Sequence, residues 1–382
     1  MRHLVCLLPL LVACREGTEA SATQSTFVPI PTSSLDAASC HGAGLAPAAV
    51  PTPVPLATLN IGPSSQLAAE AGTQLLFATG GDGAVVQIDM SSGTPVETTI
   101  VSPGTLDALL ANPLIGIATP AVLSGLCVLD AAHLAVVERT SNTILLINRL
   151  IPDTVAILAG FPNEQPGFAD GPAALARFSF GATSSCVPTG DGALLVTDPG
   201  NHALRRVELA SGGFVVTVAG LGTPVHNDGN ISEAGFDTPS GIAIACTGEL
   251  LVVESGASGN GGHRLRELRV GSTGFFGALG SVSTLAGDGV ESTIGGAMAS
   301  LAAPTGLLST LDDAVFWMDA STGLLRRYSF LTELTDCPGF VDCAAATMAG
   351  GPFAGVDASL ALDEVSGSLY VLDPSAATLF SL

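Results

Sequence analysis

The chain has 382 residues, with 34 acidic and 12 basic side chains and a formal net charge of -22 at pH 7. A surface of this charge repels nucleic acids and anionic bilayers, so no nucleic-acid partner is expected. Hydrophobic residues make up 47% of the chain and charged residues only 12%, which is the composition of a folded protein rather than a disordered one. All the basic residues are arginine, so chemistry that needs a lysine is excluded.

Residues 1–13 predict a secretory signal peptide. Met-Arg-His is followed by a short apolar run, Leu4–Ala13, which is too short for a membrane span of about 20 residues. The segment Leu11-Val12-Ala13-Cys14 resembles the lipobox of bacterial lipoproteins. That resemblance implies that Cys14 is lipidated and begins the mature chain, which would be exported and anchored in the cell envelope, at the outer membrane or cell surface. An ordinary signal peptide with an unrelated cysteine is the alternative.

Residues 14–53 predict a lipidated, flexible tether. They are rich in Thr, Ser, Ala and Pro and show no apolar periodicity. Such a coil would span roughly 35 Å on average. No transmembrane segment is expected after the signal peptide, so the lipid anchor would be the only contact with the membrane.

One short pattern recurs through the remainder of the chain, residues 54–382. It is an apolar strand that ends in an acidic or polar residue, followed by a turn and a second strand. The last residues of successive copies are 59, 60, 56, 65 and 54 positions apart, a period that suits a four-stranded unit. The copies are Leu75–Thr79, Leu134–Glu138, Leu194–Asp198, Leu250–Glu254, Ala314–Asp319 and Leu369–Asp373.

A second pattern, Ala-Gly, lies between these copies and ends a β-rich run each time. Each unit therefore has strands a to d, with the acid at the end of strand b and Ala-Gly at the end of strand d. The Ala-Gly pairs are Ala159-Gly160, Ala219-Gly220, Ala286-Gly287 and Ala349-Gly350.

These residues resemble the NHL repeat. The best copy runs from Gly192 to Val207, with Asp198, the turn Asn201-His202 and the pair Arg205-Arg206, and it is followed by Ala219-Gly220. The resemblance is good from about Thr154 to Tyr328 and weaker at both ends. It implies an all-β, six-bladed β-propeller over residues 54–382.

The two ends of the chain are expected to close this ring. The chain stops at Leu382, within what should be strand c of the sixth unit. Leu56–Ile61 lies ahead of the first unit and is otherwise unassigned, so it is predicted to supply the missing strand d. Closure in this way removes an exposed edge strand.

Six cysteines remain beyond Cys6 and Cys14, an even number in an oxidising compartment. Cys337 and Cys343 flank one c–d loop and are predicted to form a local disulfide. Cys127, Cys186 and Cys246 are expected to close strand a in successive units. Whether they pair, with one another or with Cys40, or remain buried thiols is left open.

The acids that end strand b are the first candidate ligands. In one interpretation each carboxylate accepts hydrogen bonds from the following turn, as Asp198 could from the amides near Gly200 and Asn201. In the other, some of them line the channel mouth and bind a divalent cation. No other cofactor is predicted. The candidates are Glu138, Asp198, Glu254, Asp319 and Asp373.

Histidines and arginines supply further candidates. His202 and His263 occupy the turn before strand c in adjacent units and could converge on a metal, as the resemblance to NHL-type lyases implies; alternatively they belong to the repeat. The two arginines of each pair, Arg205-Arg206 and Arg326-Arg327, point to opposite faces of their strand and are expected to bridge to acids of neighbouring units; ligand binding is the alternative.

No complete catalytic motif is present, so the leading hypothesis is not an enzyme but a binding or scaffold module for an envelope protein or glycan. The few aromatic residues expected on the loop face, Phe168, Phe236 and Phe353, favour a protein partner. The alternative is a metal-dependent lyase or lactonase-type hydrolase with its site in the propeller channel. A purely structural ring is the third interpretation.

Overall fold

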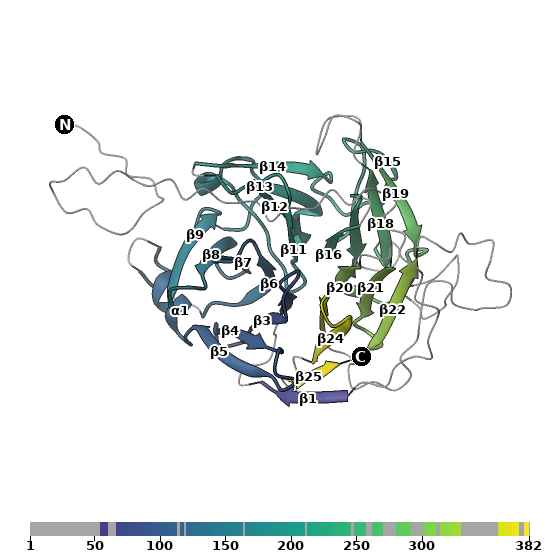
Figure 1. Cartoon of the computed structure of the whole chain (residues 1–382). Helices are drawn as coiled ribbons and strands as arrows, with labels where there is room; N and C mark the ends of the chain where they lie inside the picture. The colour runs from purple at the N-terminus through teal and green to yellow at the C-terminus, as the bar shows by residue number, and fades with distance from the viewer. Residues whose placement is uncertain are drawn as a thin grey trace, which may run out of the picture.

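The computed structural model describes residues 54–59, 66–112, 115–117, 120–162, 165–210, 212–245, 248–256, 262–269, 280–291, 301–310, 314–329, 358–373 and 378–381. In this part of the chain six antiparallel sheets are arranged as blades around a ring (Figure 1). The predicted six-bladed β-propeller is therefore confirmed.

Each blade is a meander whose strand a lies nearest the ring axis, and in the blades with a described strand d that strand lies toward the rim (Figure 1). Blade 5 shows three strands among the described residues; its predicted strand d, ending at Ala349-Gly350, lies outside them. The strands are, in blade 1, β2 (Leu67–Ala69), β3 (Leu75–Thr79), β4 (Val85–Asp89) and β5 (Val96–Val101); in blade 2, β6 (Leu123–Val128), β7 (His133–Glu138), β8 (Thr143–Asn148) and β9 (Thr154–Ala159); in blade 3, β11 (Cys186–Thr189), β12 (Ala193–Asp198), β13 (Ala203–Glu208) and β14 (Phe214–Ala219); in blade 4, β16 (Pro239–Ile244), β17 (Leu250–Glu254), β18 (Arg264–Arg269) and β19 (Ser281–Ala286); in blade 5, β20 (Pro304–Ser309), β21 (Ala314–Asp319) and β22 (Leu324–Ser329); and in blade 6, β23 (Ser359–Asp363), β24 (Ser368–Asp373), β25 (Thr378–Ser381) and β1 (Val54–Thr58).

The N-terminal strand closes the ring as predicted. β1 pairs antiparallel with β25, with Val54 opposite Ser381 and Thr58 opposite Thr378. The strand begins two residues earlier than expected, and its register shifts between Pro55 and Ala57. A proline is tolerated here because β1 is the outer edge strand of blade 6, where an amide can go unpaired within the ladder.

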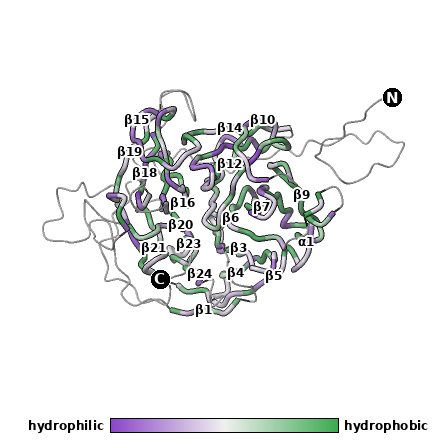
Figure 2. The backbone as a smooth tube through the Cα atoms, turned by 180° about the vertical axis from the view of Figure 1, so that it is seen from behind, coloured by the Kyte–Doolittle hydropathy of each residue, from purple (hydrophilic) through white to green (hydrophobic). Residues whose placement is uncertain are grey.

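The hydrophobic core lies between the blades, at six interfaces that we call seams. Each of the six clusters of buried apolar residues combines side chains from two adjacent blades. Alternation along the strands produces this arrangement: Leu194 and Val196 of β12 pack toward blade 2, and Leu195 between them packs toward blade 4. Accordingly, Figure 2 shows hydrophobic stretches in the strands of every blade.

Several small elements were not predicted from the sequence. β10 (Gly171–Pro172) pairs with β14, and β15 (Gly229–Asn230) pairs with β19, so blades 3 and 4 each have a fifth strand at the rim. Helix α1 (Thr105–Leu110) buries Leu106 and Leu110 in the seam between blades 1 and 2. Two 3-10 turns, η1 (Ala173–Leu175) and η2 (Pro199–Asn201), lie in connections.

A disulfide joins Cys127 to Cys186, with the two Cα atoms 6.1 Å apart. It links the inner strands of blades 2 and 3, and Cys186 begins β11 instead of closing it as predicted. Cys14, Cys40, Cys246, Cys337 and Cys343 lie outside the described residues. Among the described helices, none has the length and apolar character needed to span a bilayer.

Candidate functional site

The five acids that end strand b are all buried, and those of blades 2 to 5 form bonds within their own blade or the connection leading into it. Their exposed fractions are 3% or less. Four of them, together with Thr79 at the matching position of blade 1, each accept a hydrogen bond from a backbone amide that precedes strand a. The amides are those of Gln66 for Thr79, Val122 for Glu138, Ser179 for Asp198, Asp237 for Glu254 and Ala302 for Asp319.

The expected bonds from backbone amides of the following turn occur at Glu138 but not at Asp198. Glu138 accepts the amides of Thr140 and Ser141, at 2.8 and 2.7 Å. Asp198 instead accepts the side-chain amide of Asn201 and a guanidinium N–H of Arg205, both at 2.8 Å. The amide of Gly200 in the η2 turn donates instead to the carbonyl of Ser179, at 2.9 Å, in the connection that leads into blade 3. It is therefore not available to Asp198. Burial raises the pKa of the Asp198 carboxyl.

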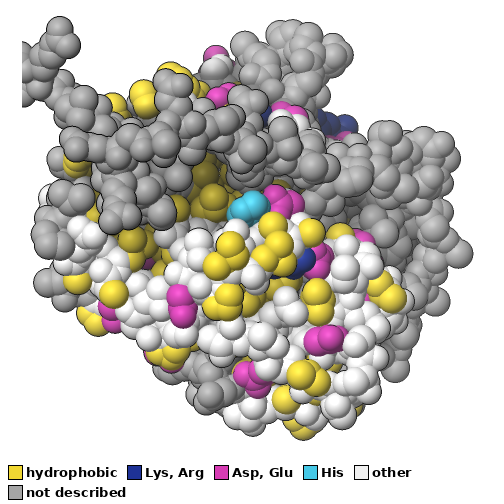
Figure 3. Space-filling view, turned by 60° about the vertical axis from the view of Figure 1, so that its left-hand side comes forward, with side chains coloured by type: hydrophobic (Ala, Val, Ile, Leu, Met, Phe, Trp, Pro, Cys, Tyr) yellow, Lys and Arg dark blue, Asp and Glu magenta, His cyan; other side chains and the backbone are white. Residues whose placement is uncertain are grey.

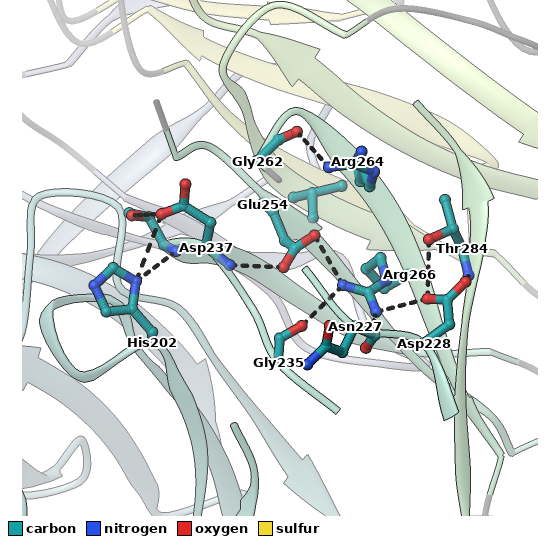
Figure 4. Close-up of polar contacts among 12 residues, drawn as sticks. His202, Asn227, Asp228, Gly235, Asp237, Glu254, Gly262, Arg264, Arg266 and Thr284 are labelled. Atoms are coloured by element: carbon teal, nitrogen blue, oxygen red, sulfur yellow. Dashed lines mark hydrogen bonds and ion pairs between the residues drawn. The ribbon is translucent and has the colours of Figure 1, made fainter. Parts of the chain in front are cut away.

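The prediction that paired arginines bridge neighbouring units is wrong for Arg205, and its counterpart in blade 4, Arg266, follows the same pattern. Arg205 contacts Asp198 and Asp170 at 2.8 and 2.7 Å, and both acids belong to the sheet of blade 3 or the connection leading into it. Arg266 contacts Glu254 and Asp228 at 3.1 and 2.7 Å in the same way (Figure 4). Burial raises the pKa of Glu254 to about 7.

Each arginine contacts one acid outside strand b, Asp170 or Asp228, and this acid also holds the fifth strand of its blade. Asp170 accepts the amide and the hydroxyl of Thr217, both at 2.9 Å, and Asp228 accepts the same two groups of Thr284 at 3.2 and 3.0 Å. In both connections the Asp is followed by Gly, which begins β10 or β15. The Asp-Gly pairs were therefore the sequence feature from which these fifth strands and their acids could have been predicted.

The remaining arginines differ in environment. Arg326 pairs with Asp319 at 2.6 Å within blade 5, and both side chains are buried. Burial raises the pKa of Asp319, which also accepts the indole N–H of Trp317 at 3.1 Å. Arg206 is partly exposed and pairs with Asp191 at 2.9 Å. These interactions stabilise the blades and leave the strand-b acids of blades 3, 4 and 5 facing arginines.

His202 and His263 each form a hydrogen bond across a seam, which we call an inter-blade latch. Nδ1 of His202 accepts the amide of Thr238 at 3.1 Å, and Nδ1 of His263 accepts the amide of Ala303 at 3.0 Å. Asn142 of blade 2 does the same with its Oδ1, which accepts the amide of Phe180 at 2.9 Å. A neutral histidine that accepts at Nδ1 carries its proton on Nε2, so neither histidine is a base at Nε2 in this state.

The latch residues have unusual backbone conformations. The φ angles of Asn142, His202 and His263 are 54°, 48° and 59°, in the left-handed region that Asn and His tolerate better than most residues. The Ala-Gly pattern is explained by the same turn. Gly160 has a φ of +100°, and a Cβ there would lie 2.6 Å from the carbonyl oxygen of Asn142; Gly220 contacts the His202 carbonyl likewise. Only glycine fits at the end of strand d.

Asp237 lies beside the His202 latch, and sequence reasoning missed it. It is 3% exposed, and its Oδ1 lies 3.6 Å from Nδ1 of His202 (Figure 4). Oδ1 accepts the hydroxyl of Thr238 at 3.1 Å, whereas Oδ2 is buried with no hydrogen-bond partner among the described residues. No repeat signal marks this position, because the matching residue before Pro304 in blade 5 is Ala302.

The structure does not bring the predicted ligands together. Within the described ranges, no group of three or more His, Cys, Asp or Glu side chains is arranged to hold a metal ion. His202 and His263 lie on opposite seams of blade 4, and each Nδ1 is engaged by a different amide. On the face shown in Figure 3, acidic side chains are mostly scattered singly and form no continuous patch.

Exposed apolar residues mark the loop side of blade 3. Phe168 is 46% exposed, and its ring lies over the guanidinium of Arg205 at 5.1 Å. A Cβ on Gly222 would lie 3.1 Å from this ring, so the ring packs on the next connection, where Leu221 is also 46% exposed. Phe236, expected on the same face, is instead fully buried beside Arg266. Phe353 lies outside the described residues.

Comparison with known proteins supports the fold only. No protein-family model and no curated protein matches the chain. A protein of unknown function from Bacteroides thetaiotaomicron is 18% identical with a TM-score of 0.53, over 69% of this chain and 58% of that one. The chain thus spans little more than half the length of that protein.

Two further solved structures are similar. A gluconolactonase from Xanthomonas campestris is 13% identical with a TM-score of 0.52, over 86% of this chain and 88% of that one. An auxiliary nutrient binding protein from Bacteroides thetaiotaomicron is 12% identical with a TM-score of 0.51, over 84% and 68%. The neighbours thus include an enzyme and a binding protein, and the shared feature is the β-propeller.

Proposed function

We propose that this protein is an NHL-type propeller that is exported, anchored to the cell envelope through a lipid on Cys14, and used as a binding module for an envelope protein. The signal-like segment and the lipobox-like residues support the anchor. The Asn-His turn, the paired arginines and the Ala-Gly ends support the NHL assignment, because each has a defined place in the repeated blade.

The observation that carries the binding role is the presentation of Phe168. A large apolar ring that remains nearly half exposed, yet is held against Arg205 and Gly222, is already ordered before any partner arrives. Ordered aromatic side chains in apolar surroundings commonly supply much of the energy of a protein interface. Leu221 of the next connection extends the same surface.

The charged side chains of the propeller support the same conclusion. Arg205, Arg266 and Arg326 are buried in ion pairs with strand-b acids, so these groups stabilise blades in place of contacting a substrate. The alternative function, a metal-dependent lyase or lactonase-type hydrolase in the channel, rests on the fold that the gluconolactonase shares. Metal analysis of the purified protein together with lactone hydrolysis assays tests it directly.

The test of the binding role compares two phenylalanines. Full-length protein with Phe168→Ala is expected to lose about tenfold or more in affinity for the envelope protein that the wild type captures. Phe214→Ala is the matched control, since Phe214 is 49% exposed but lies at the start of β14, whereas Phe168 packs on Gly222, beyond the other end of that strand. An equal loss of affinity in both variants, or no loss in either, would show that the surface around Phe168 is not the binding surface. Incorporation of labelled fatty acid into wild type but not Cys14→Ala tests the anchor separately.

A further inference from the structure

Blade 4 is held at both of its seams by a histidine latch. On one side the amide of Thr238, just before β16, donates to His202 of blade 3; on the other, His263 of blade 4 accepts the amide of Ala303, just before β20. The seam between blades 2 and 3 has the same bond with Asn142 in place of histidine. Among the described residues, two of these latches can titrate and one cannot, and all three lie at matching places in the repeat.

The amides that these histidines accept belong to strained residues. Thr238 and Ala303 have φ angles of 56° and 51°, and each precedes a proline, Pro239 or Pro304. A residue before proline avoids helical conformations, and a β-branched residue rarely adopts a positive φ. Such strain persists only where the surroundings hold it, and the latch is one of the bonds that do.

Protonation reverses the role of the latch atom. A protonated imidazole has an N–H at Nδ1 as well as at Nε2, so Nδ1 would face the amide N–H of Thr238 as donor against donor. Asp237 offers a replacement partner, because its Oδ1 lies 3.6 Å from Nδ1 of His202 and its Oδ2 has no partner among the described residues. His202 can thus exchange a backbone amide for a carboxylate when it gains a proton.

Burial lowers the pKa of both histidines, and the acids that face them raise it. Asp237 and Asp198 attract a proton to His202. Glu291, Asp319 and Asp237 attract one to His263, and Arg264 opposes it. Burial outweighs these acids and lowers the pKa of both histidines. The neutral, latched state is therefore the one present at neutral pH.

We propose that His202 and His263 are acid-sensitive latches that fasten blade 4 to its neighbours at neutral pH and release the Thr238 and Ala303 amides when the imidazoles are protonated. The Asn142 latch stays closed over the same pH range because an amide side chain does not titrate. This proposal is based on the hydrogen bonds across the seams and does not depend on the binding role or the lipid anchor. An exported protein would meet such pH changes, since its surroundings are not buffered by the cell.

Hydrogen exchange of the full-length protein, resolved to single amides and corrected for intrinsic rates, tests the proposal. Between pH 7.5 and pH 5 the protection of the Thr238 and Ala303 amides should fall by about tenfold or more, while that of Phe180 changes by less than about twofold. His202→Asn should abolish the pH response at Thr238 and leave that at Ala303. His263→Asn should do the reverse.

The reverse substitution, Asn142→His, keeps the test decisive if a histidine variant fails to fold. Asn142→His should make the amide of Phe180 lose protection in acid, because it places a titratable acceptor in the third latch. Equal pH responses of the three amides in the wild type would overturn the proposal. So would a pH response at Thr238 that survives in His202→Asn, or a Phe180 amide that remains insensitive to pH in Asn142→His.

Discussion

Nη1 of Arg205 lies 2.8 Å from Oδ2 of Asp198, and neither side chain has any exposed surface. The next residue, Arg206, pairs with Asp191 at 2.9 Å, but its side chain is 16% exposed and that of Asp191 is 43% exposed. Two adjacent arginines on β13 thus form the same kind of bond in very different surroundings. Replacing each arginine in turn therefore compares the contribution of a buried ion pair to stability with that of an exposed one.

Arg205→Met should therefore lower the free energy of unfolding by about 3–5 kcal/mol, because it leaves the Asp198 carboxyl buried without its cation. Arg206→Met is the matched control and should cost only about 0–1 kcal/mol, since water screens that pair. Urea unfolding of the two variants measures both values. Similar costs at the two positions would contradict the burial argument.

Gly220→Ala should destabilise the fold by about 2–4 kcal/mol, since the added Cβ meets the carbonyl of His202 in a residue whose φ is +108°. Gly93→Ala provides the comparison: its φ is +76°, but a Cβ there has nothing within 4 Å, so only the conformational cost of about 1 kcal/mol remains. Thermal or urea unfolding distinguishes the two. If Gly93→Ala costs as much as Gly220→Ala, steric contact with the latch residue is not the reason for the Ala-Gly pattern.

Removing the Cys127–Cys186 disulfide should lower stability by about 2–4 kcal/mol, because the bond closes a long loop, 59 positions in sequence, between the inner strands of two blades. The double variant Cys127→Ala, Cys186→Ala is compared with the oxidised wild type by urea unfolding. Peptide mapping without reduction provides the direct check. Recovery of Cys127 linked to any other cysteine would show that the pairing is different.

Loss of the closing strand should be costly. A chain that starts at residue 60 lacks β1 and also Leu59, which is 3% exposed in the core between blades 6 and 1. We expect a loss of about 2–5 kcal/mol and self-association through the uncovered edge of β25. A chain that starts at residue 50 keeps β1 and is the control. Thermal unfolding and size-exclusion chromatography compare the two chains, and equal behaviour would mean that β1 does not fasten the ring.

Acid should destabilise the protein partly through His226. Burial lowers the pKa of His226 to about 4, against about 6.5 in an unfolded chain, so the unfolded state binds more protons between these values. Its contribution is complete above pH 6.5 and is lost as the pH falls toward 4. His226→Gln should therefore flatten the decline of unfolding free energy between pH 6.5 and 4, measured by urea unfolding at several pH values. An unchanged slope would argue against a half-buried imidazole that stays neutral in the folded protein.

Local sequence determined the blades. The strand positions, the acid at the end of strand b and the Ala-Gly at the end of strand d follow from alternation, β-branched residues and turn chemistry, all of which act over a few residues. The closing strand was predictable as well, because a sixth blade without a strand d leaves an edge that the segment ahead of β2 can cover. The left-handed conformations of Asn142, His202 and His263 were not predicted, although Asn and His tolerate them better than most residues.

Only the tertiary structure decided what these residues contact. Asp198 accepts the Ser179 amide and Arg205 instead of the backbone amides of its own turn, Phe236 is covered while Phe168 remains exposed, and Cys186 pairs with Cys127. The His202 latch joins residues 36 positions apart in sequence. Such contacts depend on how each blade twists and how closely it packs on the next one. Those quantities are set by side-chain packing across the seams, and no short segment of the sequence encodes them.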